Sequence, residues 1–211
     1  MPVIPPLWRS SLQDSDSFDL PLTPLKILVS GGFGAGKTTL VGTVSEIEPL
    51  TTEETLTVAS VSTDNVSGVE GKTTTTVALD FGRITFADQG LMLLLFGTPG
   101  QDRYWFMWPD LAEGAIGALV LADTRRLEDC FPVVDYFLRI GLPFAVAINQ
   151  FDGADRYEAT EVHAALALAP DTPVVLCDAR DFVAAREALI TLVRHAHSLA
   201  TKARQIATTP L

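Results

Sequence analysis

The sequence predicts one three-layer α/β domain, in which a mostly parallel sheet is covered by helices on both faces. Short apolar runs alternate along the chain with longer amphipathic ones, a pattern typical of parallel strands joined by crossover helices. A glycine-rich turn separates the first apolar run from the first helical segment. The chain has 211 residues, of which 47% are hydrophobic, so it is long and apolar enough to bury a sizeable core.

Each element is predicted from its own pattern. Residues 25–30 are short, apolar and branched, as a buried strand requires, and a helix is expected over about 36–47. Residues 48–75 are rich in Thr, Ser, Glu and Gly without a steady period, so we expect a long loop with short strand pieces. Further strands are expected at 76–83, 90–96, 115–122, 143–149 and 173–177, and further helices at about 127–140, 156–168 and 181–202.

The two ends of the chain differ from its middle. Residues 1–24 contain five prolines and a Ser/Asp cluster, which favours extended and solvated chain. We therefore predict a flexible N-terminal arm at 1–24, a nucleotide-binding domain at 25–202 and a C-terminal tail at 203–211.

The charge and the cysteine content of the chain argue against several classes of function. The 26 acidic and 15 basic side chains leave a net charge of −11, which argues against nucleic-acid binding and against direct docking on an anionic membrane. Two cysteines, Cys130 and Cys177, provide no disulfide framework and are expected to be buried thiols. No apolar run reaches the roughly 18 residues of a transmembrane segment. We expect a cytoplasmic protein that approaches a membrane only through protein partners.

A phosphate-binding motif is the strongest signal in the chain. The segment 31–38 matches G-x-x-x-x-G-K-[ST] between a predicted strand and a predicted helix, the context that the motif requires. Lys37 is expected to reach the β- and γ-phosphates, and the Thr38 hydroxyl to ligate Mg²⁺. The chain is therefore predicted to have the P-loop NTPase fold. The residues expected to bind the phosphates are Gly31, Gly32, Phe33, Gly34, Ala35, Gly36, Lys37, Thr38 and Thr39.

A second motif predicts which base is bound. Asn149, Gln150 and Asp152 form an N-x-x-D pattern at the end of a predicted strand. The Asp152 carboxylate can accept hydrogen bonds from the N1–H and 2-amino groups of guanine, whereas adenine offers an acceptor at N1 and has no 2-amino group. By itself N-x-x-D is not specific, because it is also common in capped turns. Its position behind the P-loop is what favours the interpretation as a GTP/GDP site. Asp178, Ala179 and Arg180 follow the last predicted strand, where the Ala179 N–H could face guanine O6.

The order of these motifs resembles that of Ras-like small GTPases over about residues 25–200. Within that superfamily the chain is most similar to the prokaryotic MglA-type GTPases, and in particular to the conservon (Cvn) GTPases of actinomycetes. The stretches that carry this similarity are 72–76, 80–82, 96–101 and 104–106. The resemblance implies a small G-protein fold.

The resemblance also implies roles for residues outside the P-loop. Gly100 would donate its N–H to the γ-phosphate, and Gln101 would orient the attacking water, with Lys37 at the phosphates. Thr76 is the expected switch threonine that senses Mg²⁺ and the γ-phosphate, with Thr74 and Thr75 as close rivals.

Two departures from the family pattern concern the metal and the base. Gly97 stands where Ras-like proteins have an aspartate that supports Mg²⁺, so the metal is expected to rely on Thr38, the phosphates, waters and Thr76. Gln150 replaces the lysine of N-K-x-D, which alters the packing over the base.

A third departure concerns catalysis. Residues 73–76 contain no arginine, so an arginine finger from that segment is absent. Such an arginine contributes about 10³–10⁵ in rate, and intrinsic hydrolysis is therefore expected to be slow. Arg103, Arg125 and Arg126 are candidate substitutes, although a surface charge or an ion pair is the commoner role of such residues.

Partner contacts are expected at residues 72–83 and 98–110. Five large apolar side chains follow one another at 104–108, and they cannot all face inward. We expect Phe106 in the core and some of the others in a partner-binding surface that depends on the nucleotide. The resemblance to the conservon group implies a roadblock/MglB-type regulator and a complex with a sensor kinase.

Three functions remain open from the sequence. The first is a molecular switch that binds Mg²⁺–GTP and hydrolyses it slowly. The second is a pseudo-GTPase scaffold that binds guanine nucleotide without turnover, and Gly97 and the missing arginine motivate it. The third is an ATP-using P-loop enzyme, which Asp152 disfavours.

Overall fold

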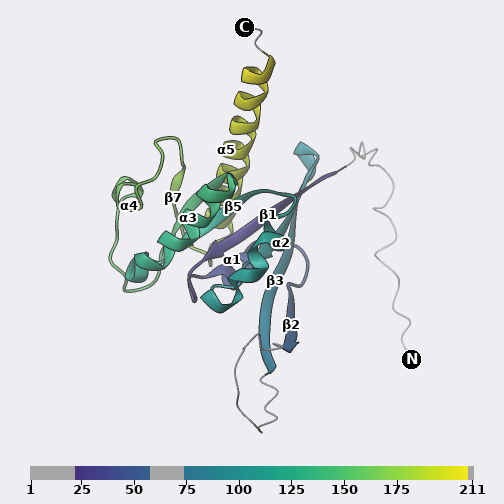
Figure 1. The fold of residues 1–211 in the computed structure, drawn as a ribbon, viewed down its shortest axis with the longest axis vertical. Coiled ribbons are helices and arrows are strands. Elements are labelled where there is room, and N and C mark those ends of the chain that lie inside the picture. The colour runs from purple at the N-terminus through teal and green to yellow at the C-terminus, as the bar shows by residue number, and fades with distance from the viewer. Residues whose placement is uncertain (1–21, 58–73, 209–211) are drawn as a thin grey trace, which may run out of the picture.

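The computed structural model describes residues 22–57 and 74–208 (Figure 1). Its middle layer is a seven-stranded sheet with the order β2-β3-β4-β1-β5-β6-β7. Parallel pairing runs from β4 through β1, β5 and β6 to β7, while β2 and β3 add antiparallel pairs at one edge. The strands are β1 (Thr23–Gly31), β2 (Leu50–Thr57), β3 (Thr74–Phe86), β4 (Leu91–Gly97), β5 (Ala115–Ala122), β6 (Phe144–Asn149) and β7 (Val174–Cys177).

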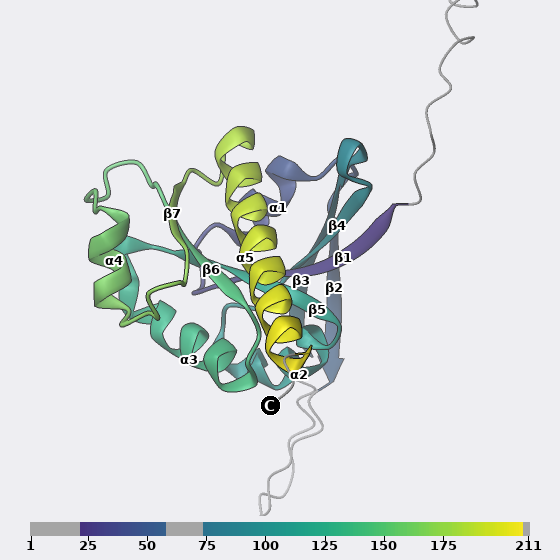
Figure 2. The ribbon, with the colours of Figure 1, turned by 90° about the horizontal axis from the view of Figure 1, so that it is seen from above.

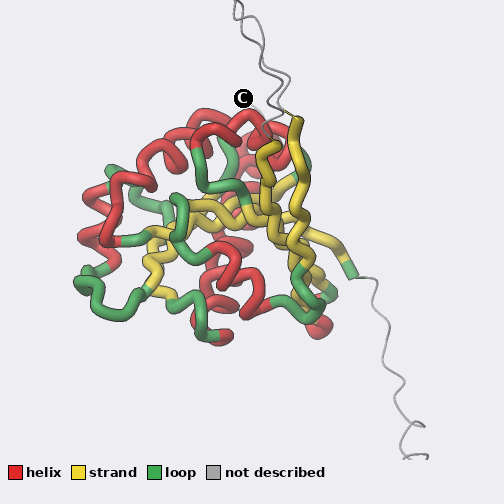
Figure 3. The backbone as a smooth tube through the Cα atoms, turned by 90° about the horizontal axis from the view of Figure 1, so that it is seen from below, coloured by secondary structure: helices red, strands yellow, loops and turns green. Residues whose placement is uncertain are grey.

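Helices cover both faces of this sheet, and Figure 3 shows the strands as a layer between them. α1 (Lys37–Val44) and α5 (Phe182–Thr208) pack on one face, with α5 lying across several strands in Figure 2. The opposite face is covered by α2 (Trp108–Ala112), α3 (Phe131–Ile140) and α4 (Ala159–Ala165). Three short 3-10 helices, η1 (Ala87–Gln89), η2 (Asp102–Met107) and η3 (Thr124–Cys130), complete the elements of the described residues.

Each face has its own hydrophobic cluster. Under α5, Leu189 and Leu192 are fully buried, and Gly117 of β5 lets the helix approach, because a Cβ there would lie 3.0 Å from Leu192 Cδ1. On the other face the Trp108 ring stacks on Phe137 at a centroid distance of 5.7 Å. Burial of both sheet faces explains why β5 and β6 are continuous apolar runs rather than alternating ones.

The predicted fold class is confirmed, with the largest differences at element ends. The segment 48–75, expected as a long loop with short strand pieces, contains the eight-residue strand β2, whose threonines suit an edge strand. Helix α1 ends at Val44 rather than near 47, and α4 is shorter than the expected 156–168. α5 extends six residues past 202 to Thr208. Residues 1–21, 58–73 and 209–211, which include most of the predicted arm, lie outside the described residues.

Both cysteines are buried, as expected, and burial raises the pKa of each thiol to about 12. Within the described ranges, no helix combines the length and the apolar character that crossing a membrane requires.

The packing of α5 gives a stability prediction. Replacing Leu192 with Ala removes a fully buried side chain and should lower the free energy of unfolding by about 2–5 kcal/mol. The same change at Leu138, which is 53% exposed, should alter it by no more than about 0.5 kcal/mol. Denaturant unfolding of both variants measures the difference. Equal losses would show that α5 is not packed as described.

Candidate functional site

The glycine-rich turn lies at the carboxyl end of β1, where the chain turns into α1. Because β1 has β4 on one side and β5 on the other, this turn is at the point where the strand order reverses, the usual ligand position in such sheets. Gly36 has φ +103°, and a Cβ there would lie 2.4 Å from Asn149 Nδ2. Only glycine fits that position, because the P-loop and the predicted base-recognition segment are in close contact there.

Lys37 is folded back over the P-loop. Its Nζ donates to the carbonyl oxygens of Gly31 at 2.9 Å and Gly32 at 2.7 Å. Burial lowers the pKa of the Lys37 ammonium to about 8, an effect that the charge of Asp80 partly offsets. A Cβ at Gly100 would lie 2.5 Å from Lys37 Nζ, so the structure brings together two of the residues expected at the γ-phosphate.

The predicted metal ligand Thr38 has a carboxylate partner that the sequence analysis missed. Thr38 Oγ1 donates to Asp80 Oδ2 at 2.6 Å, and Asp80 is only 8% exposed. Phe81 of β3 pairs with Phe96 of β4, which places Asp80 beside Gly97. A Cβ at Gly97 would lie 3.0 Å from the Cβ of Asp80 and 3.1 Å from its Oδ2. A carboxylate from the neighbouring strand therefore lies beside position 97, where the family pattern has an aspartate.

The expected switch threonine is placed only in part. Thr76 lies on β3, where it pairs with Thr55 of β2, and its rivals Thr74 and Thr75 precede it on the same strand. The side chains of all three lie outside the described part of the structure. Their role at the metal therefore stays a prediction.

Asn149 connects three segments that are far apart in the sequence. Its Nδ2 donates to the Ala35 carbonyl of the P-loop at 2.9 Å, and its Oδ1 accepts from the Ala179 N–H at 3.0 Å. The side chain is 4% exposed, so these bonds lie inside the domain. The Ala179 N–H, expected to face the base, is directed to Asn149 in this structure.

Asp152, the predicted base-recognition carboxylate, has an ion-pair partner. Arg180 donates to both oxygens of Asp152, through Nη1 at 2.6 Å and Nη2 at 3.1 Å. It also binds Asp178, through Nε at 2.9 Å. Hydrogen bonds from Arg180 lower the pKa of Asp178 to about 2 and hold the pKa of Asp152 below its usual value. The nearby Gln150 side chain accepts from Arg156.

Of the three candidate substitutes for an arginine finger, Arg126 contacts the P-loop, donating from Nη2 to the Phe33 carbonyl at 2.6 Å. Arg125 is held by two bonds to Asp123 and lies 3.8 Å from the Phe151 ring centroid. Arg103 lies 4.8 Å from the ring of Tyr104. Arg125 thus has a structural role, whereas Arg103 also lines the cavity beside the P-loop and stays a candidate.

Gln101 lines a cavity of about 470 Å³ beside the P-loop. The predicted catalytic residue is therefore close to the phosphate-binding turn, across a space that a ligand or water can enter. The cavity is lined by Gly31, Gly32, Phe33, Gly100, Gln101, Arg103, Trp105, Glu128, Asp129, Pro132 and Val133.

The aromatic segment after Gln101 is arranged in the opposite way to the expectation: Phe106 is the exposed residue of the five, and the other four are buried or half-buried. Tyr104 and Trp108 are buried, whereas Phe106, expected in the core, is 65% exposed. Residues 102–107 form the 3-10 helix η2, whose three residues per turn direct Phe106 away from the face that carries Tyr104 and Met107.

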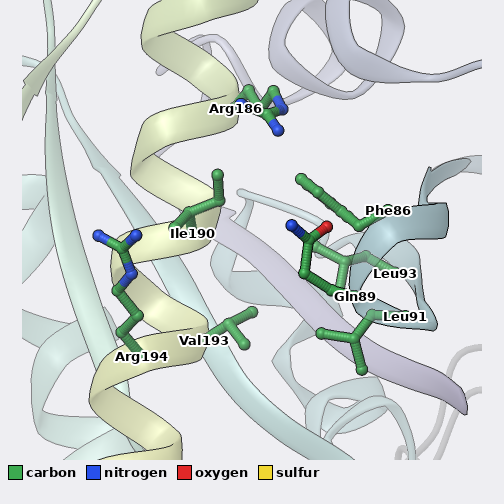
Figure 4. Close-up of a pocket in the computed structure, with 8 residues that line it drawn as sticks. All are labelled: Phe86, Gln89, Leu91, Leu93, Arg186, Ile190, Val193 and Arg194. Carbon is green, nitrogen blue, oxygen red and sulfur yellow. The ribbon is translucent and has the colours of Figure 1, made fainter.

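A separate cavity of about 200 Å³ lies between α5 and the strands β3 and β4 (Figure 4). None of the predicted site residues lines it. Its walls are formed by Phe86, Gln89, Leu91, Leu93, Arg186, Ile190, Val193 and Arg194.

Comparison with known proteins agrees with this architecture. The model of a family described as "Conserved hypothetical ATP binding protein" matches residues 29–199. An uncharacterized protein of Methanocaldococcus jannaschii is 29% identical over 133 residues, which are 62% of this chain and 73% of that protein.

Solved structures with the same fold include G domains of FeoB. That of the T. maritima FeoB iron transporter superposes with a TM-score of 0.58 at 19% identity, covering 82% of this chain and 99% of that one. The FeoB G-domain of Methanococcus jannaschii gives 0.57 at 14% identity, with 83% and 99% covered. A GDP-bound mutant of S. thermophilus NFeoB gives 0.56 at 19% identity, with 82% and 60% covered. At these identities the likeness shows a shared fold.

The contact between positions 80 and 97 gives a direct test. Replacing Gly97 with Asp would force a second carboxylate against Asp80 and should lower the free energy of unfolding by about 1–3 kcal/mol. Combining it with Asp80→Gly should restore most of the loss, because one carboxylate then occupies the shared space. Denaturant unfolding compares the single and double variants. Additive losses would show that the two positions do not compete for space.

Proposed function

The chain belongs to the family described as conserved hypothetical ATP binding proteins, and from the geometry of its site we propose that it is a Mg²⁺-dependent guanine-nucleotide switch with slow GTP hydrolysis. One observation carries the proposal: Asn149 hydrogen-bonds both the P-loop carbonyl of Ala35 and the Ala179 N–H. These bonds hold the phosphate-binding turn and the base-recognition segments of β6 and β7 in one site.

Guanine is favoured over adenine by the side chain at position 152. Asp152 is 81% exposed at its side chain, and its carboxylate can accept two hydrogen bonds from a guanine edge. The FeoB structures determined with GDP share the fold and support a guanine nucleotide here. The family description favours the alternative of an ATP-using protein, which predicts tight ATP binding with weak competition from GTP.

The oxygen donors at Thr38 and Asp80 fit Mg²⁺, which prefers carboxylate, hydroxyl and phosphate oxygens. Thr38 would hold the metal with support from Asp80, and Thr76 is the proposed switch ligand. Bound Mg²⁺ would supply positive charge at the β- and γ-phosphates.

The protein groups around the phosphates have separate roles in this proposal. Lys37 would exchange the carbonyls of Gly31 and Gly32 for phosphate oxygens, which satisfy its ammonium better than neutral acceptors do. Gly100 would donate its N–H to the γ-phosphate, and Gln101 would orient the attacking water. Hydrolysis would be slow, because residues 73–76 contain no arginine finger and Arg126 is bonded to the Phe33 carbonyl.

The signalling part of the proposal rests on the segments that flank the site. Residues 72–83 and 98–110 would bind effectors, and the 65%-exposed Phe106 lies five residues after Gln101, where partner binding can respond to the nucleotide. We further propose that the chain is of the MglA-like, conservon-type branch, with a roadblock/MglB-type regulator and a sensor-kinase complex as partners. The alternative is a scaffold that keeps its nucleotide without turnover.

Single-turnover phosphate release tests this function. The wild-type chain should release phosphate slowly from GTP and not from ATP. Gln101→Ala should lower the rate by about 10²-fold, the loss expected when the attacking water is no longer positioned. Gln89→Ala, in an exposed 3-10 turn away from the P-loop, should leave the rate unchanged.

The outcomes separate the hypotheses. Faster release from ATP than from GTP would overturn the assignment of guanine. GTP that stays bound and uncleaved, with or without Gln101, would replace the switch by the scaffold.

A further inference from the structure

The structure places a charged side chain against the carboxylate that the proposed function assigns to the base. Arg180 presents two N–H groups, Nη1 and Nη2, to the two oxygens of Asp152. Guanine presents the same pattern, since its N1–H and 2-amino N–H are adjacent donors on one edge. A guanidinium fork and a guanine edge are therefore alternative partners for the same carboxylate.

We propose that Arg180 occupies the base-recognition carboxylate as an internal competitor of guanine and so sets the base selectivity of the site. This inference rests on the proposed function, because it assigns a regulator to the Asp152 that would recognise guanine. Guanine enters by displacing Arg180 from Asp152, and part of the binding free energy is spent on breaking that ion pair.

Arg180 has a second partner that makes the displacement feasible. Its Nε donates to Asp178 Oδ1 and its Nη2 to Asp178 Oδ2, both at 2.9 Å, and its backbone N–H binds the same carboxylate. When Asp152 binds guanine in place of Arg180, the Arg180 guanidinium remains paired with Asp178, so its charge stays compensated. Arg156, the other nearby arginine, is bonded to Gln150 and does not take this place.

The competition acts differently on the two purines. Adenine has no N1–H and no 2-amino group, so it cannot replace the two bonds from Arg180, and its N1 can accept from an arginine instead. Arg180 therefore lowers the affinity for guanine nucleotides without lowering that for adenine nucleotides. This competition would explain how a chain with the proposed guanine-recognition aspartate can belong to a family described as ATP binding proteins.

Calorimetric titration of GDP and of ADP into the full chain with Mg²⁺ tests the inference. Arg180→Ala should raise the affinity for GDP about two- to fivefold, the scale of one exposed ion pair, and leave that for ADP unchanged. Arg180→Gln, which keeps polarity and much of the length, should change GDP affinity in the same direction. Arg186→Ala removes the same charge on α5 next to the Figure 4 cavity and should change neither affinity.

A double-mutant cycle identifies the mechanism. In an Asp152→Ala background, Arg180→Ala should no longer raise GDP affinity, because the competitor has nothing left to occupy. Weaker GDP binding by the Arg180 variants would show that the arginine stacks on the base and would overturn the inference. Equal gains for GDP and ADP would overturn it as well. If the wild type binds no GDP and Asp152→Ala changes nothing, the proposed function itself fails.

Discussion

The hydrogen bond from Thr38 to Asp80 is the interaction on which the proposed chemistry depends. It joins the first residues of α1 to the middle of β3 at 2.6 Å and places a mostly buried carboxylate next to the expected metal ligand. The bond is possible because Gly97 has no side chain, and the Asp80 carboxylate fills the space beside it. In the proposed magnesium site, Asp80 on the adjacent strand would compensate for the missing carboxylate at Gly97.

The remaining parts of the site are held by polar contacts rather than by the core. Asn149 bonds the P-loop and the segment after β7, and Gly36 lets the two approach because a side chain there would collide with Asn149. Two hydrophobic clusters, one on each sheet face, fix the strands whose carboxyl ends carry these residues. The residues proposed for phosphate binding, base recognition and metal support therefore meet at one edge of the sheet, where the strand order places a ligand site.

Local signals predicted most of this arrangement. The P-loop and the N-x-x-D motif are each continuous in the sequence, and the apolar runs of β5 and β6 are unbroken. Short stretches of sequence are therefore enough to predict the fold and the position of the proposed phosphate site. The pairing of Asp80 with Gly97 could not be predicted because it depends on the register between β3 and β4. The contact of Arg180 with Asp152 joins two loops, and Phe106 faces outward because η2 is a 3-10 helix. Each of these features depends on a contact between distant segments or on local helix geometry, and neither can be deduced from a short stretch of sequence.

The Mg²⁺ dependence of GDP affinity measures whether Asp80 supports the metal. In the wild type, Mg²⁺ should raise the affinity strongly over that measured in EDTA, and the isosteric Asp80→Asn should lose about ten- to 100-fold of that gain, as removal of a supporting carboxylate predicts. Asp88→Asn, an exposed change on η1, serves as the control and should keep the full gain. An Asp80→Asn protein with undiminished Mg²⁺ dependence would contradict the assignment of Asp80 as the carboxylate that replaces the one missing at Gly97.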